Sequence, residues 1–291
     1  MSLLRVTLIS VFLHFFSILS ASDKIYASIK KGAVSEIKEI IASNPDVLKH
    51  TDTKYGTPLI YAVSRQRPEI AALLIESGAD PAFTDKKTKE NALFHLLDMP
   101  QTEKNLQKAI QMIEILKDSK IDFNAVNAEN MTPLYQYCTG RQSLNTLNLK
   151  KIFLQKLIDA GADPSAKLKR DLPLLNAVLL KVLKSNPDYI EIAKLLIQNG
   201  VSVNEPCRKN AECKNSKTFT EGDTPLHIVI KRPGFQEADK APMIKLLVEN
   251  GAKIRTKNKK KETPRKLVKR RTPEYDALCR TKVKRKVHYR H

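Results

Sequence analysis

The chain has 291 residues, 42% of them hydrophobic and 28% charged, which is typical of a globular protein. Its 9 Gly and 15 Pro exclude a collagen-like or low-complexity chain, and 4 Cys are too few for the disulfide scaffold of a small secreted domain. The net charge is +20, and most of the excess lies at one end, because residues from Lys253 onward include 17 basic and 3 acidic side chains.

Residues 1–22 have the pattern of a secretory signal peptide. Arg5 precedes an apolar stretch from Val6 to Leu19, and the small residues Ser20, Ala21 and Ser22 follow. The apolar stretch is shorter than the roughly 20 residues of a membrane-spanning helix. We therefore expect a signal peptide over residues 1–21 and export of the mature chain to the periplasm or the medium. The alternatives are a buried N-terminal helix or a membrane anchor.

Two signals alternate through the chain, one that opens a helix and one that ends a helix. The openings are Thr57-Pro58-Leu59, Asn91-Ala92-Leu93, Thr132-Pro133-Leu134, Leu172-Pro173-Leu174, Thr224-Pro225-Leu226 and Thr263-Pro264. The endings are Gly78-Ala79-Asp80, Lys120-Ile121-Asp122, Gly161-Ala162-Asp163, Gly200-Val201-Ser202 and Gly251-Ala252-Lys253. Such self-similarity is typical of repeat proteins.

Each signal has a physical basis. Thr caps a helix N-terminus, and Pro fits the first turn because it needs no amide hydrogen there. Apolar residues at helical spacing, as in Ile70, Leu73 and Leu74, predict the buried face of a second helix. Gly ends that helix because it tolerates the left-handed conformation of a C-terminal cap. One repeat is therefore a pair of antiparallel helices followed by a turn.

The sequence resembles the ankyrin-repeat family, most closely over residues 55–80 and 223–252. The resemblance implies an all-α solenoid of about six helix pairs including caps. We expect this array over residues 22–272, with an atypical N-terminal cap at residues 23–50 and a basic tail at residues 273–291.

Two features depart from the family. The opening-to-ending distance is 21 residues in the first full repeat but 29, 29, 28 and 27 in the next four, which predicts lengthened helices or helix-helix loops. An insertion between Cys207 and Glu221 is expected to project from the surface.

The resemblance also implies binding of a protein partner through the turn tips and the outward positions of the first helix of each pair. The alternative is that these positions are only solvated. By register, the candidates are Tyr55, Tyr61, Lys87, His95, Asn130, Gln136, Arg170, Asn176 and Ile228.

No catalytic pattern is evident. The six His residues are scattered, and neither a metal-binding His/Cys spacing nor a Gly-rich phosphate loop occurs. We expect no enzymatic activity, no metal and no cofactor. Cys207 and Cys213 flank a short polar loop and could form a disulfide, and free thiols are the equal alternative.

Basic clusters near the C-terminus suggest a second kind of site, one for anionic surfaces. They comprise Lys259, Lys260, Lys261, Lys269, Arg270, Arg271, Lys284, Arg285 and Lys286. Such clusters bind nucleic acid or anionic lipid without sequence preference and weaken with salt. A solvated end of the array or nuclear-import signals are the alternatives.

The sequence thus predicts an exported, monomeric, non-enzymatic binding protein with a protein partner and no permanent membrane span after cleavage. Export together with this repeat type favours a bacterial source. The alternative function is binding of nucleic acid or an anionic surface through the basic tail, with the array as a scaffold.

Overall fold

The computed structural model describes residues 23–97, 102–140, 147–166, 172–181, 188–208, 219–232 and 237–282. These residues form helices joined by turns, without a strand beyond the single bridge between Asp52 and Gly56. The described residues fall into two compact units. Unit 1 comprises the described parts of Met1–Glu129 and Gln142–Ala162, and unit 2 those of Asn130–Arg141 and Asp163–His291.

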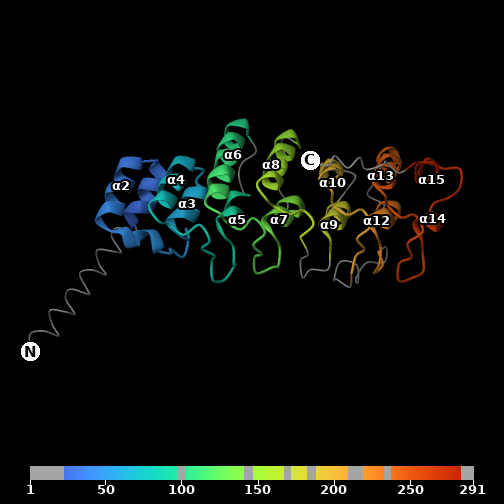
Figure 1. Ribbon diagram of the computed structural model, residues 1–291, viewed down its shortest axis with the longest axis horizontal. Coiled ribbons are helices and arrows are strands. Elements are labelled where there is room, and N and C mark those ends of the chain that lie inside the picture. Colours follow the sequence, from blue (N-terminus) through green and yellow to red (C-terminus); the bar gives the residue numbers. More distant parts are fainter. Residues whose placement is uncertain are drawn as a thin grey trace, which may run out of the picture. The chain divides into compact units, whose positions relative to one another are not determined.

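Unit 1 contains two layers of helices (Figure 1). Residues 23–31 form a first helix, followed by α2 (Val34–Ser43) and the 3-10 helix η1 (Pro45–Lys49). The inner layer holds α3 (Pro58–Ser64) and α5 (Ala92–Leu96), which pack on each other. The outer layer holds α4 (Pro68–Glu76), α6 (Glu103–Asp118) and α8 (Leu147–Asp159), with α6 between the other two.

Unit 2 repeats the same two-layer arrangement (Figure 1). Its inner helices are α7 (Pro133–Thr139), α9 (Leu174–Lys181), α12 (Pro225–Lys231) and α14 (Pro264–Leu267), each in contact with the next. Its outer helices are α10 (Asp188–Gln198), α13 (Glu237–Glu249) and α15 (Pro273–Cys279). Among the described helices, α14 and α15 form a short last pair. α15 packs on α13, although it lies in residues 273–291, which were expected to form a tail.

The helix starts are built by local side-chain chemistry, as predicted. The Thr57 hydroxyl accepts a hydrogen bond from the Ile60 amide at 3.3 Å, and the Thr132 hydroxyl accepts one from the Tyr135 amide at 3.2 Å. At the second opening, the Asn91 side chain accepts from the Leu93 amide at 3.1 Å. These caps satisfy amides that have no partner inside the helix.

The lengthening of the later repeats lies partly in their outer helices. α4 of the first full repeat has 9 residues, whereas α6 has 16 and α8 has 13. The rest falls between inner and outer helices, where residues 98–101, 141–146, 182–187 and 233–236 lie outside the described residues. The core between the layers is apolar, and Leu74, Leu93 and Leu196 are completely buried in it.

Candidate partner-binding groove

A turn before α3 forms one wall of the candidate site. The Asp52 carboxylate accepts hydrogen bonds from the Lys54 and Tyr55 amides at 2.7 and 2.9 Å. The Asp52 and Gly56 backbones exchange two further hydrogen bonds at 3.0 and 2.9 Å. The turn therefore holds Tyr55 in a fixed position, although Tyr55 lies outside any helix.

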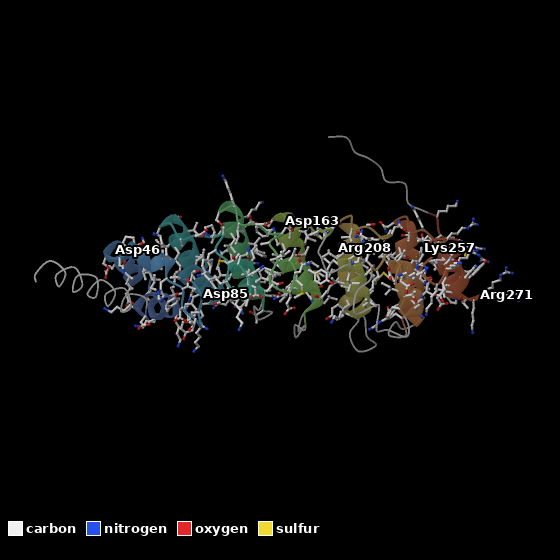
Figure 2. All side chains as sticks on the ribbon, turned by 90° about the horizontal axis from the view of Figure 1, so that it is seen from below. Asp46, Asp85, Asp163, Arg208, Lys257 and Arg271 are labelled. Atoms are coloured by element: carbon white, nitrogen blue, oxygen red, sulfur yellow. The ribbon has the colours of Figure 1, made fainter. Side chains whose placement is uncertain are left out.

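A second turn, before α5, forms the facing wall. The Asp85 carboxylate accepts hydrogen bonds from the Thr88 amide at 2.7 Å and the Lys87 amide at 2.8 Å. These bonds, from Thr88 first and then Lys87, hold the pKa of Asp85 below its ordinary value, because they stabilise the ionised carboxylate. The Asp85 amide also donates to the Glu90 carbonyl at 3.0 Å, which closes the turn. Figure 2 labels Asp85 in this turn of unit 1.

Between these turns and helices α3 and α5 lies a groove of about 510 Å³, entirely within unit 1. Four of the predicted partner-binding residues line it: Tyr55, Tyr61, Lys87 and His95. Residues that the sequence did not single out also contribute, notably Arg65 and Phe83. The groove thus brings together predicted residues up to 40 positions apart in the chain.

Tyr55 and Tyr61 line the groove, and the buried Tyr26 packs against both. The Tyr55 and Tyr61 ring centroids lie 4.6 Å apart, and the buried Tyr26 ring lies 5.6 Å from Tyr55 and 5.5 Å from Tyr61. The Tyr26 hydroxyl donates to the Gly56 carbonyl at 2.6 Å, which ties the first helix to the turn. Burial raises the pKa of Tyr26, so its hydroxyl stays protonated as this bond requires. Tyr55, the half-buried ring of the three, is thus held in place for contact with a partner.

The exposed charges at the rim of the groove are basic. Lys54, Arg65 and Lys87 are exposed, whereas the three acidic lining residues, Asp52, Asp85 and Glu90, are half-buried. Asp52 and Asp85 also accept hydrogen bonds from their own turns. The Lys54 ammonium lies 5.1 Å from the centroid of the Tyr55 ring. The groove therefore combines aromatic surface with positive charge.

The predicted row of exposed residues does not hold in full in either unit, because Tyr61 of unit 1 lines the groove but is buried, at 7% exposed. Asn176 and Ile228 are completely buried, so the prediction that they contact a partner is wrong. The Asn176 amide donates to the Glu205 carbonyl at 3.0 Å and to the Cys207 sulfur at 3.4 Å, which fixes the next turn. Ile228 is enclosed because α12 packs against α9, α13 and α14.

The other predicted positions in unit 2 have mixed outcomes. Asn130 and Gln136 are half-buried, which leaves their binding role a prediction, and Arg170 lies outside the described residues. Cys207 is buried, but Cys213 lies outside the described residues, so their disulfide is also untested. Lys259, Lys260, Lys261, Lys269, Arg270 and Arg271 are all exposed, whereas residues 284–286 are not described.

Sequence reasoning missed a buried charged network that joins the last two repeats of unit 2. The Lys231 ammonium lies 3.1 Å from both Asp223 carboxylate oxygens and 2.8 Å from a Glu262 oxygen. Asn258 donates to Asp223 and to Glu262, both at 2.8 Å. Hydrogen bonds from Lys231 and Asn258 lower the pKa of Glu262, which keeps it ionised.

His227 belongs to the same network, and its surroundings favour the neutral ring. Its Nδ1 accepts a hydrogen bond from the Thr224 amide at 3.2 Å, and its Nε2 lies 3.2 Å from the Glu262 carbonyl, to which it donates in that tautomer. Burial lowers the pKa of His227. The role of His227 is therefore structural.

Two absences apply to the described part of the chain. No group of three or more His, Cys, Asp or Glu side chains there is placed to hold a metal ion. Among the helices of the described ranges, none has the length and apolar character needed to cross a membrane.

Comparisons with known proteins identify the repeat. The family description "Ankyrin repeat" matches residues 56–86 and 221–259. Alpha-latrocrustotoxin-Lt1a from Latrodectus tredecimguttatus is 28% identical over 133 residues, which are 46% of this chain and 8% of that protein. The matched region thus spans less than a tenth of this curated relative.

Solved structures share the fold. The ankyrin repeat domain of Bcl-3, described as a unique member of the IkappaB protein family, is 20% identical with a TM-score of 0.63, over 87% of this chain and 96% of that one. An ankyrin repeat domain from Acinetobacter baumannii AYE is 19% identical with a TM-score of 0.56, over 79% of this chain and 98% of that one. The chain therefore carries ankyrin repeats at residues 56–86 and 221–259 and shares the fold of ankyrin repeat domains.

Proposed function

We propose that this chain is a non-enzymatic module that binds a protein partner through the groove of unit 1. Ankyrin repeats in general mediate protein-protein interaction. The observation that carries the proposal is the groove itself, where Tyr55 and Tyr61 lie beside the exposed Lys54, Arg65 and Lys87. Rigid aromatic rings provide contact area at little entropic cost, and the basic rim attracts carboxylates. The preferred partner segment therefore carries acidic and aromatic side chains.

Selection from a displayed random-peptide library tests this proposal. We expect the enriched peptides to be rich in Asp, Glu and aromatic residues. They should bind Arg65→Glu and Lys87→Glu variants at least about 10-fold more weakly, since each reversal replaces attraction by repulsion. Lys38→Glu is the matched control, because Lys38 is exposed on α2 and is not a groove-lining residue. Peptides that bind all three variants as well as wild type would contradict the proposal.

We further propose that the chain is exported, on the pattern of residues 1–22 alone. Intact mass of the protein fractionated from expressing cells tests this. Loss of about the first 21 residues, as the cleavage pattern predicts, is the expected result. A full-length mass would refute cleavage and make residues 1–22 part of the working protein.

A second candidate function is binding of an anionic surface or nucleic acid through the C-terminal basic clusters. One observation favours it: all the Lys and Arg side chains of residues 253–282 are exposed. Retention on heparin should fall when the clusters are neutralised, and unchanged retention would exclude this function.

A further inference from the structure

The last repeat of unit 2 presents a concentrated positive surface on an ordered scaffold. Residues 253–282 include thirteen Lys and Arg and three acidic residues, a net charge of +10, and every one of the thirteen basic side chains is exposed. Figure 2 shows nitrogen-tipped side chains gathered at this end of unit 2, with Lys257 and Arg271 among them. α14 contacts α12 and α15, and α15 contacts α13, so no other described helix covers the far side of this pair. We call this surface the basic end face.

The acidic residues nearby do little to neutralise the basic end face. The Glu262 carboxylate is held by Lys231 and Asn258 inside the network described above. Asp276 pairs with Arg280 at 3.1 Å within α15. Lys259 pairs with Glu221 at 2.6 Å, but its side chain remains 64% exposed. The positive charge is therefore available to an external anion.

The turn that carries three of these lysines is rigid. The Asn258 amide donates to the Glu262 carbonyl at 3.0 Å, and the Glu262 amide donates to the Asn258 side chain at 2.9 Å. The Asn258 side chain is in turn bonded to buried Asp223. The backbone of Lys259, Lys260 and Lys261 is thus anchored in the core, so the array loses little backbone freedom when these side chains meet a ligand.

The chemistry of the basic end face favours a lipid surface over nucleic acid. Nucleic acid recognition uses helices in grooves or aromatic rings that stack on bases. Here α14 has only 4 residues and α15 only 7. The Tyr275 hydroxyl accepts from Arg265 at 3.4 Å, and the Arg265 guanidinium lies 5.8 Å from the ring centroid, so this ring is already occupied.

The described residues of the basic end face also have no large exposed apolar side chain, because in the described chain only Val126 and Ile152 are of that kind. Insertion into the hydrocarbon of a bilayer is therefore not expected. Many exposed lysines without apolar anchors fit electrostatic attachment to the charged surface of a bilayer.

We propose that the basic end face binds the surface of a bilayer that contains anionic phospholipids. The inference rests on the second candidate function and narrows it to one ligand class. It uses residues 253–282 of the packed array.

Vesicle co-sedimentation of the full chain tests this proposal. Vesicles of phosphatidylcholine with about one-third phosphatidylserine should bind the protein, and pure phosphatidylcholine should not. Raising NaCl from about 0.1 M to about 0.5 M should release it, since the Debye length shortens. A triple variant with Lys259→Gln, Lys260→Gln and Lys261→Gln should bind the anionic vesicles about 10- to 100-fold more weakly.

The matched control removes the same charge from unit 1, with Lys24→Gln, Lys31→Gln and Lys38→Gln, all exposed. It should bind anionic vesicles like wild type. Equal losses in both triple variants, or no loss in the first, would overturn the basic end face as the site. Binding of a duplex of about 20 base pairs without binding of anionic vesicles would overturn the lipid proposal and leave the second candidate function standing. Binding of neither vesicles nor duplex would exclude both the lipid proposal and the second candidate function.

Discussion

Replacement of Lys231 by Met should strongly destabilise unit 2, because it leaves a buried carboxylate without its counter-charge. The Lys231 side chain is 8% exposed and that of Asp223 is 0% exposed. Breaking a buried ion pair from one side costs about 3–5 kcal/mol. We expect the lower end, about 3 kcal/mol, because Asp223 keeps hydrogen bonds from the Thr220 amide and from Asn258, both at 2.8 Å.

Urea unfolding followed by circular dichroism measures this cost, and a double variant isolates its cause. Adding Asp223→Asn to Lys231→Met removes the stranded charge and should recover much of the lost stability. Lys194→Met is the control, since Lys194 pairs with Glu191 at 2.6 Å on the surface of α10 and is 40% exposed. That change should cost no more than about 1 kcal/mol. A loss for Lys231→Met as small as that of the control would refute the reasoning.

Three further predictions follow from single residues. Unit 2 should lose stability as pH falls below 6.5, the ordinary pKa of histidine, because the pKa of His227 is lower in the folded chain and only the unfolded chain gains the proton there. Urea midpoints measured at several pH values should show this loss, and His227→Gln should make the midpoint depend less on pH. Gly161→Val should destabilise by about 1–3 kcal/mol, since Gly161 has φ of 117°, whereas Lys120→Gly, at φ of 60°, should leave the midpoint unchanged or raised. Leu74→Ala should cost about 2–5 kcal/mol, because Leu74 is completely buried, and an unchanged urea midpoint would contradict its place in the core.

Local chemistry explains which parts of the fold could be predicted. Thr57 and Thr132 cap their helices through a hydrogen bond to the third residue onward, so the sequence itself contains both partners. Lys120 takes the left-handed conformation at an ending where glycine stands in the other repeats, as the alignment of endings implies. Interactions between residues close in sequence can therefore be predicted from the sequence alone.

The groove and the charged network show where sequence reasoning ends. The sequence predicts Tyr55 and Lys87 as binding residues because turn tips are exposed in this repeat, and both line the groove. It also predicts Asn176 and Ile228 as exposed, whereas both are buried. Whether such positions are exposed depends on how neighbouring repeats pack, and a single repeat pattern does not encode that. Lys231 lies 8 residues from Asp223 and 31 from Glu262, and no local periodicity links the three.

The two proposed binding surfaces can be tested independently, because they share neither residues nor helices. The groove lies wholly within unit 1 and the basic end face wholly within unit 2. Charge reversal at Arg65 and Lys87 should therefore weaken peptide binding without changing vesicle binding, and neutralisation of residues 259–261 should do the opposite. Since both surfaces are basic, a loss of both activities in either variant would mean that net charge, and not a built site, is responsible for the binding.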